Sequence, residues 1–432
     1  MADTQPSMIH PDSIDSQDPN LHPESTKQKS RRPANTAFRQ QRLKAWQPIL
    51  TPKTVLPLFF AIGIIFAPIG GGLIYASNVV QEVILDYSRC GLDAPEFPAA
   101  ASPMPSGTYS SHFTKISGFV PDNNPPTWVK KSNSTITYPN GATITGTICT
   151  LDFPLNGKLE PPIYFYYRLT NFYQNHRRYA KSFNTDQLSG KAVSVGSIQS
   201  SDCTPLTTAT DPVDGKVKPY YPCGLAANSL FNDTFYNPVA LNPHNVNDTN
   251  NSNETYYFSS DGISWASDKA LYGVSKYNLE TDVLVPPNWI ERYGTHYSAN
   301  NTPDLVNDEA FQVWMRLAGL PTFSKLAQVN SNATMDTGRY SVDIASFTEY
   351  GGTKSIILST GTVMGGRNPF LGIAYVVVGG ICIVLGTLFT VTHLIRPRKL
   401  GDHTYLSWNN EHDSTATTSG RDGVMVGERG TA

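Results

Sequence analysis

Residues 55–80 have the sequence VLPLFFAIGIIFAPIGGGLIYASNVV, and residues 368–395 have the sequence NPFLGIAYVVVGGICIVLGTLFTVTHLI. Neither stretch contains Asp, Glu, Lys or Arg, and each exceeds the roughly 20 apolar residues that a helix needs to cross a bilayer. The first stretch follows 54 mostly polar residues, too far from the start for a cleaved secretory signal. The sequence therefore predicts two transmembrane helices, the first of them an uncleaved signal anchor.

Basic residues flank the two helices on their outer sides. Those before the first helix are Arg39, Arg42, Lys44 and Lys53, and those after the second are Arg396, Arg398 and Lys399. The inner flanks mix Glu82, Asp86 and Glu349 with Arg89, Lys354 and Arg367. Since cytosolic flanks are enriched in Lys and Arg, both termini are predicted to be cytosolic. Residues 81–366 then form a lumenal or extracellular ectodomain.

Two further features are typical of an ectodomain. Asn-x-Ser/Thr sequons, the acceptors of N-linked glycans, occur only there; they begin at Asn133, Asn232, Asn247, Asn250, Asn253, Asn300 and Asn332. Four of the five cysteines, Cys90, Cys149, Cys203 and Cys223, lie in the same segment, whereas Cys382 lies within the second helix. An oxidising compartment would pair these four cysteines in one of three ways. The alternative is that the thiols are unpaired and the sequons are coincidental.

The ectodomain is predicted to be β-rich, antiparallel and sandwich-like, with short helices. Asn140-Gly141 separates two alternating runs, which is typical of a hairpin because both residues tolerate positive φ. Residues 338–344 alternate Tyr340, Val342 and Ile344 with polar neighbours, as in a strand with one buried face. A helix is expected from Asn307 or Asp308 to Gly319 and Pro321, with Trp314 in the core.

The two tails have a different composition. Residues 1–34 and the stretch from about 413 to 432 contain too few large apolar residues to order themselves, so we expect disorder there. Residues 35–54 form a cytosolic juxtamembrane segment. Its aromatic and basic residues Phe38, Arg39, Arg42 and Trp46 are suited to the membrane surface or to a partner.

No catalytic motif stands out. The chain lacks a phosphate-binding Gly-x-x-x-x-Gly-Lys-Ser/Thr, a His-Glu-x-x-His zinc motif and a Gly-x-Ser-x-Gly elbow. Residues 336–338 read Asp-Thr-Gly, but aspartic-protease chemistry needs a second such carboxylate, and none exists. The sequence therefore predicts no enzyme, no cofactor and no metal site. Two helices without internal charges also form no transport pathway of their own.

Contact with a partner is also predicted on two further surfaces. Small residues let helices approach closely in lipid; the candidates are Gly70, Gly71, Gly72, Gly379 and Gly386. The alternative is that the two helices only pack on each other. Residues 161–182 combine many aromatic rings with His176, Arg177 and Arg178, which could pair with acidic groups on a partner or with lipid headgroups. The alternative there is a strand of core aromatic residues that ends in a solvated basic turn.

Several longer motifs carry a family resemblance over residues 35–409. They are Thr36-Ala-Phe-Arg-Gln-Gln-Arg-Leu-Lys-Ala-Trp-Gln-Pro-Ile-Leu, Asn171-Phe-Tyr-Gln-Asn-His-Arg-Arg-Tyr, Cys223-Gly-Leu-Ala-Ala-Asn-Ser-Leu-Phe-Asn-Asp-Thr-Phe, Pro287-Asn-Trp, Phe311-Gln-Val-Trp-Met-Arg-Leu-Ala-Gly-Leu-Pro and Gly365-Gly-Arg-Asn-Pro-Phe-Leu-Gly-Ile-Ala-Tyr. With these motifs the chain resembles the non-catalytic beta subunits of type IV P-type ATPases, the phospholipid flippases. This family is also called the cell-division-control protein fifty and ligand-effect modulator three family.

The resemblance implies a heterodimer with the catalytic subunit of a flippase, in contact with membrane lipids. It implies roles in folding, in exit from the endoplasmic reticulum and in transport activity, with residence in the endoplasmic reticulum, the Golgi and endosomal system or the plasma membrane. It further implies disulfides Cys90–Cys149 and Cys203–Cys223 and a glycan on Asn232. Two other functions, a receptor or adhesion protein and a lumenal hydrolase, would require ligand binding or turnover by the isolated ectodomain.

Overall fold

The structure is a computed structural model that describes residues 35–43, 51–114, 120–138, 141–241, 253–347, 350–362 and 365–397. Several sequence predictions lie outside these residues: the two disordered tails, Trp46, Asn140, Asn247 and Asn250.

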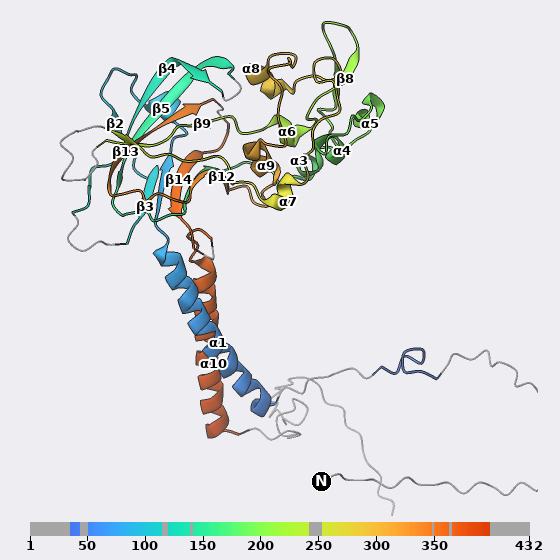
Figure 1. The fold of residues 1–432 in the computed structure, drawn as a ribbon. Coiled ribbons are helices and arrows are strands. Elements are labelled where there is room, and N and C mark those ends of the chain that lie inside the picture. The colour runs from blue at the N-terminus through green and yellow to red at the C-terminus, as the bar shows by residue number, and fades with distance from the viewer. Residues whose placement is uncertain are drawn as a thin grey trace, which may run out of the picture. The chain divides into compact units, whose positions relative to one another are not determined.

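The two uncharged stretches form the longest helices. These are α1 (Pro52–Val79) and α10 (Phe370–Ile395), which lie side by side in Figure 1. Both are long and apolar enough to cross a membrane. Large apolar side chains stay exposed on both, with Ile64 and Val384 each 65% exposed. Such a surface is unfavourable in water and favourable in hydrocarbon, because lipid tails are as apolar as these side chains.

The ectodomain contains two antiparallel sheets (Figure 1). In order across the first sheet lie β12 (Phe323–Asn330), β6 (Ile163–Leu169), β14 (Lys354–Thr360), β1 (Glu82–Asp86) and β3 (Tyr109–His112). Across the second lie β11 (Glu254–Thr255), β10 (Val239–Ala240), β13 (Gly338–Ser346), β5 (Thr143–Leu155), β4 (Thr127–Thr137) and β2 (Ser102–Pro103), and β9 (Thr234–Phe235) also pairs with β13. A separate pair joins β7 (Thr208–Thr210) to β8 (Val217–Pro219).

One hydrophobic core is shared by the two sheets. It contains Leu85 and Phe165 from the first sheet together with Leu151 and Phe153 from the second, all fully buried. Because successive side chains of a strand point to opposite faces, alternate residues of each strand reach this core. The predicted sandwich-like, β-rich ectodomain between two helices is therefore confirmed.

The strand patterns predicted from the sequence are present. Tyr340, Val342 and Ile344 of β13 are buried. Strands β4 and β5 pair in register from Thr137 and Thr143 onward, as the hairpin prediction requires. Gly141, two residues before β5, has φ +82°, a backbone conformation that favours glycine.

A second core lies among short helices. The helices of the ectodomain are α2 (Cys90–Asp93), α3 (Arg177–Lys181), α4 (Thr185–Leu188), α5 (Val195–Gln199), α6 (Leu225–Asn228), α7 (Ala266–Lys269), η1 (Pro287–Trp289), α8 (Ile290–Tyr293) and α9 (Glu309–Met315). Trp289 and Trp314 are both buried here, and their indole N–H groups donate to the carbonyl groups of Ala227 and Ala226. Trp314 is thus a core residue, because its one polar atom has a buried partner.

Helix α9 is shorter than predicted. It begins as expected, since the Asp308 carboxylate accepts a hydrogen bond from the Phe311 N–H at 2.9 Å. It ends at Met315, not at Gly319 and Pro321. The Lys325 ammonium group donates to the carbonyls of Val313, Trp314 and Arg316. A side chain from β12 therefore satisfies the last carbonyls, and the helix needs no further turn.

Two disulfides brace the ectodomain. Cys90 of α2 is joined to Cys149 of β5, and Cys203 is joined to Cys223. This is the pairing that the family resemblance implied. Cys382 within α10 is a free thiol.

A buried ion pair connects the first sheet to the loop before β9. The Lys354 ammonium group lies 2.8 Å from the Asp233 carboxylate, and the two side chains are 3% and 0% exposed. Asp233 also accepts hydrogen bonds from the Tyr87 hydroxyl at 2.8 Å and the Phe347 N–H at 2.9 Å. Burial raises the pKa of Tyr87 far above its usual value, so the hydroxyl stays a donor.

Candidate partner-contact surfaces

Glycines spaced by seven residues form the contact between α1 and α10. A Cβ added at Gly63 would lie 3.0 Å from the carbonyl oxygen of Gly379, and one at Gly70 would lie 2.8 Å from that of Gly372. One at Gly386 would lie 3.3 Å from Phe59. Seven residues are almost two helical turns, so these glycines share one face and let the backbones approach. Gly70, Gly379 and Gly386, predicted as partner contacts, thus face the other helix of the same chain.

Two glycines predicted to contact a partner lie elsewhere on α1. Apart from the adjoining residues and backbone of α1 itself, no described atom lies within 4 Å of a Cβ added at Gly71 or Gly72. Gly380 of α10 has the same open surroundings within the described chain. These positions therefore leave room for another helix, and their contact with a partner stays a prediction.

Substitution of a glycine in the helix contact and of one outside it should have different effects on stability. We expect Gly70→Leu to separate α1 from α10, because the new side chain would meet the Val376 backbone, and to lower the melting temperature of the purified chain. Gly71→Leu, with no described neighbour, serves as the matched control and should leave the melting temperature unchanged. Thermal unfolding in detergent measures both; equal effects would contradict the observed helix contact.

The predicted basic patch is a solvated turn after a strand of core aromatic residues. Phe165 and Tyr167 of β6 are buried. The basic side chains that follow are exposed: His176 directly precedes α3, and Arg177 and Arg178 are its first two residues. The core aromatic strand and the exposed basic residues are therefore both present, one after the other along the chain.

This turn is held in place by its polar neighbours. The fully buried Gln174 accepts a hydrogen bond from the Ala318 N–H at 2.8 Å, and the Asn175 side chain donates to the Gly319 carbonyl at 2.9 Å. A hollow of about 360 Å³ opens beside it, lined by Tyr173, His176, Arg178, Tyr179, Pro205 and Leu225. A fixed backbone that presents exposed cations is suited to contact with an acidic surface.

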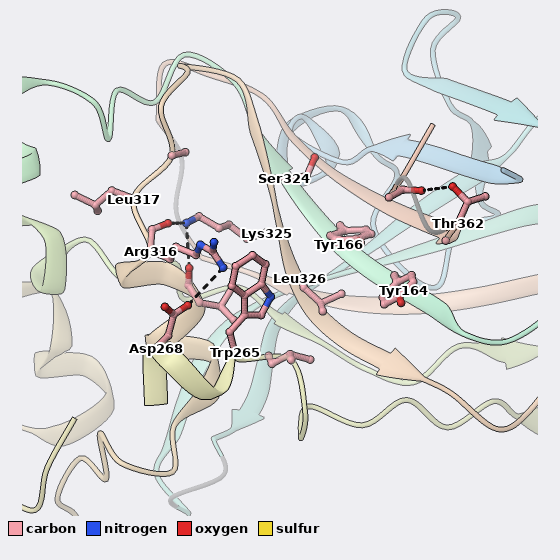
Figure 2. A pocket seen from close by; sticks show the side chains of 15 residues that line it. Tyr164, Tyr166, Trp265, Asp268, Arg316, Leu317, Ser324, Lys325, Leu326 and Thr362 are labelled. Carbon is pink, nitrogen blue, oxygen red and sulfur yellow. Dashed lines mark hydrogen bonds and ion pairs between the residues drawn. The ribbon is translucent and has the colours of Figure 1, made fainter. Parts of the chain in front are cut away.

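A pocket of about 500 Å³ lies beside β6 and β12 (Figure 2). The Arg316 guanidinium group stacks over the Trp265 ring at 3.3 Å and lies 3.6 Å from the Asp268 carboxylate. Burial lowers the pKa of the neighbouring Lys325 to about 8, and its ammonium group is already bonded to three carbonyls. Each charged group drawn there has a partner within the chain. These contacts hold α7 and the end of α9 against β12.

A third cavity is a crevice of about 520 Å³ between the strands and the helical core. One wall comes from strand residues such as Tyr167 of β6 and Gln328 of β12, and the other comes from η1, α8 and α9. Carboxylates line it, among them Asp261, Glu291 and Asp304. Within the described part of the chain, no group of three or more His, Cys, Asp or Glu side chains is placed to hold a metal ion.

The remaining predicted residues, apart from Asn232, are exposed where the structure describes them. In residues 35–43, Arg39 and Arg42 are exposed and the Phe38 side chain is 77% exposed. Asn133, Asn253, Asn300 and Asn332 are exposed, whereas Asn232 is half-buried.

Sequence reasoning missed two groups of residues. Gly63 and Gly372 take part in the helix contact, and their seven-residue spacing from Gly70 and Gly379 was a detectable signal. The Asp233–Lys354 pair had no such signal, because 121 residues separate the two positions along the chain.

Comparison with known proteins identifies the family. The model of the ligand-effect modulator 3 (LEM3) and CDC50 family matches residues 73–399. The chain belongs to this family. A CDC50 family member from Chaetomium thermophilum, the "Phospholipid-transporting ATPase accessory subunit CDC50", is 42% identical over 384 residues, which are 88% of this chain and 91% of that protein.

More distant relatives cover a similar span. The "Phospholipid-transporting ATPase accessory subunit CRF1" of Saccharomyces cerevisiae is 39% identical over 89% of this chain and 90% of its own. "Cell cycle control protein 50A" of Bos taurus is 35% identical over 90% of this chain and 93% of its own. Together with the two apolar helices, this similarity makes the chain an integral membrane protein of the CDC50 family.

Proposed function

We propose that this chain is the accessory subunit of a phospholipid-transporting P-type ATPase and that it performs no catalysis itself. The observation that carries the proposal is the similarity over 88% of the chain to a relative that is named as such a subunit. The chain would form a heterodimer with the catalytic subunit. It would support the folding of that subunit, its exit from the endoplasmic reticulum and its transport activity, and so help to maintain phospholipid asymmetry.

The proposed topology places both termini in the cytosol. Basic residues outside α1 and α10 support this orientation. The two disulfides support an oxidising compartment for the ectodomain. In that compartment the sequons, including Asn232, Asn300 and Asn332, would carry N-linked glycans. The compartments proposed are the endoplasmic reticulum, the Golgi and endosomal system and the plasma membrane.

Three surfaces are proposed to hold the catalytic subunit. The open side of α1 at Gly71 and Gly72 would contact a transmembrane helix. The exposed turn from His176 to Arg178 would contact acidic groups on the lumenal side. The segment from Phe38 to Trp46 would contact the catalytic subunit on the cytosolic side.

Charge reversal tests the lumenal surface. We expect Arg177→Glu combined with Arg178→Glu to weaken co-purification of the catalytic subunit about tenfold or more, because like charges would then face each other. Both side chains are exposed, so the melting temperature should not change. Lys216→Glu, at another exposed position, is the matched control. Unchanged co-purification of the double variant would remove this turn from the interface.

Deletion tests the function itself. In cells that lack this chain and any redundant paralogue, the catalytic subunit should stay in the endoplasmic reticulum, and the asymmetric distribution of phospholipid at the cell surface should be lost. Microscopy of the tagged ATPase and a lipid-binding probe measure the two effects. Normal export together with normal lipid asymmetry would contradict the proposal.

A further inference from the structure

The crevice between the strands and the helical core has a glycosylation sequon in its wall. Asn232 lines the cavity, beside Phe231 and Asp233. The next two residues are fixed in the core: the Asp233 carboxylate pairs with Lys354, and Thr234 of β9 pairs with Ala345 of β13. The backbone at Asn232 is therefore held at the crevice, and a glycan attached to its side chain would begin there.

The side chains of the crevice suit a carbohydrate. The half-buried Phe231 ring beside Asn232 can pack against the apolar face of a sugar ring, whereas Trp289 and Tyr293 of the helical wall are only 5% and 6% exposed. Carboxylates and amides such as Glu291, Asp304 and Asn307 can accept or donate hydrogen bonds to sugar hydroxyls. A pocket that combines aromatic area with a few polar groups is typical of small-ligand sites, and its volume of about 520 Å³ lies in their usual range.

One wall residue also has an unmet hydrogen-bonding capacity. The Gln328 side chain donates from Nε2 to the Phe235 carbonyl at 3.2 Å. Its Oε1 atom is buried and has no hydrogen-bond partner among the residues that the structure describes. A buried acceptor without a partner costs free energy, and a sugar hydroxyl or N-acetyl N–H group would supply the missing donor.

From these observations we propose that the first two sugars of an N-linked glycan on Asn232 are seated in this crevice, where they join the strand wall to the helical wall. The inference rests on the lumenal orientation of the ectodomain under the proposed function. It assigns a structural role to this one glycan. The exposed positions Asn253 and Asn332 line none of the three cavities described above, so glycans there would extend into solvent.

Enzymatic release of the glycans tests the seating. The full chain, purified in detergent with any partner that accompanies it, is treated with an endoglycosidase that cleaves between the two core sugars. Site-resolved mass spectrometry then gives the rate of release at Asn232 and Asn332. We expect release at Asn232 to be roughly tenfold slower or more, and a tenfold ratio corresponds to a tenfold preference for the seated state. After denaturation the two rates should become equal.

A wall variant separates seating from general burial of the backbone. Combining Glu291→Ala with Asn307→Ala changes two exposed side chains of the crevice and should speed release at Asn232 towards the rate at Asn332. The matched control is Glu280→Ala, at an exposed residue outside the crevice, which should leave both rates unchanged.

Several results would overturn the proposal. These are an unmodified Asn232, equal release rates in the native protein, or protection that survives in the wall variant. The glycan could also be released freely while the crevice residues are protected only in the presence of the catalytic subunit. That result would assign the crevice to a segment of the partner instead. The first three results do not bear on whether the chain binds an ATPase, so the seating can fail while the proposed function stands.

Discussion

Replacing Lys354 by Met should destabilise the ectodomain by about 3–5 kcal/mol, the usual cost of breaking a buried ion pair by removing one partner. The Asp233 carboxylate is 0% exposed, so it would lose its ammonium partner in a site that water does not reach. Its bonds from the Tyr87 hydroxyl and the Phe347 N–H would not replace a full positive charge. Unfolding by denaturant, followed by tryptophan fluorescence, measures the loss.

An exposed ion pair provides the control for Lys354. Lys158 and Glu160 lie 3.2 Å apart, but their side chains are 48% and 64% exposed. Lys158→Met should therefore change stability by less than about 1 kcal/mol, since water screens such pairs. If the two Lys→Met variants unfold at the same denaturant concentration, the buried pair is not the anchor described above.

Loss of the first disulfide should have an effect of similar size. The bond between Cys90 and Cys149 closes a loop of 59 residues, and the chain-entropy model gives about 4 kcal/mol for a loop of that length. It also fixes α2, which follows β1 of the first sheet, to β5 of the second sheet. We expect the Cys90→Ser and Cys149→Ser double variant to yield little folded protein and to melt well below the parent.

The second disulfide and the free thiol provide comparisons for the loss of the first disulfide. The bond between Cys203 and Cys223 closes a loop of 20 residues, for which the same model gives about 3 kcal/mol. Cys382→Ser, within α10, removes a cysteine without removing a bond and controls for the substitution itself. A Cys90 and Cys149 double variant as stable as Cys382→Ser would contradict the bracing role.

The architecture of this chain could be predicted from local patterns. Uncharged runs of more than 20 residues predict membrane helices because no other structure satisfies the backbone in lipid. Alternation in Tyr340, Val342 and Ile344 predicts a strand because the side-chain period of a strand is two. These signals lie within single segments, so one sequence is enough to detect them.

The contacts between distant segments could not be predicted in the same way. The crevice at Asn232 forms only when β9, β12 and the short helices come together. The early end of α9 depends on Lys325, which reaches the helix from a separate strand. Small residues such as Gly70 and Gly379 indicate close helix packing, but composition alone does not show whether they face their own chain or a partner.

Co-purification is the direct test of whether this chain is a subunit of a phospholipid-transporting ATPase. The full chain, tagged at one terminus and solubilised from native membranes in mild detergent, is isolated and its companions are identified by mass spectrometry. We expect a type IV P-type ATPase in near-equimolar amount, and a reduced amount with the Arg177→Glu and Arg178→Glu variant. Recovery of the free chain alone, from membranes in which such an ATPase is present, would contradict the proposed function.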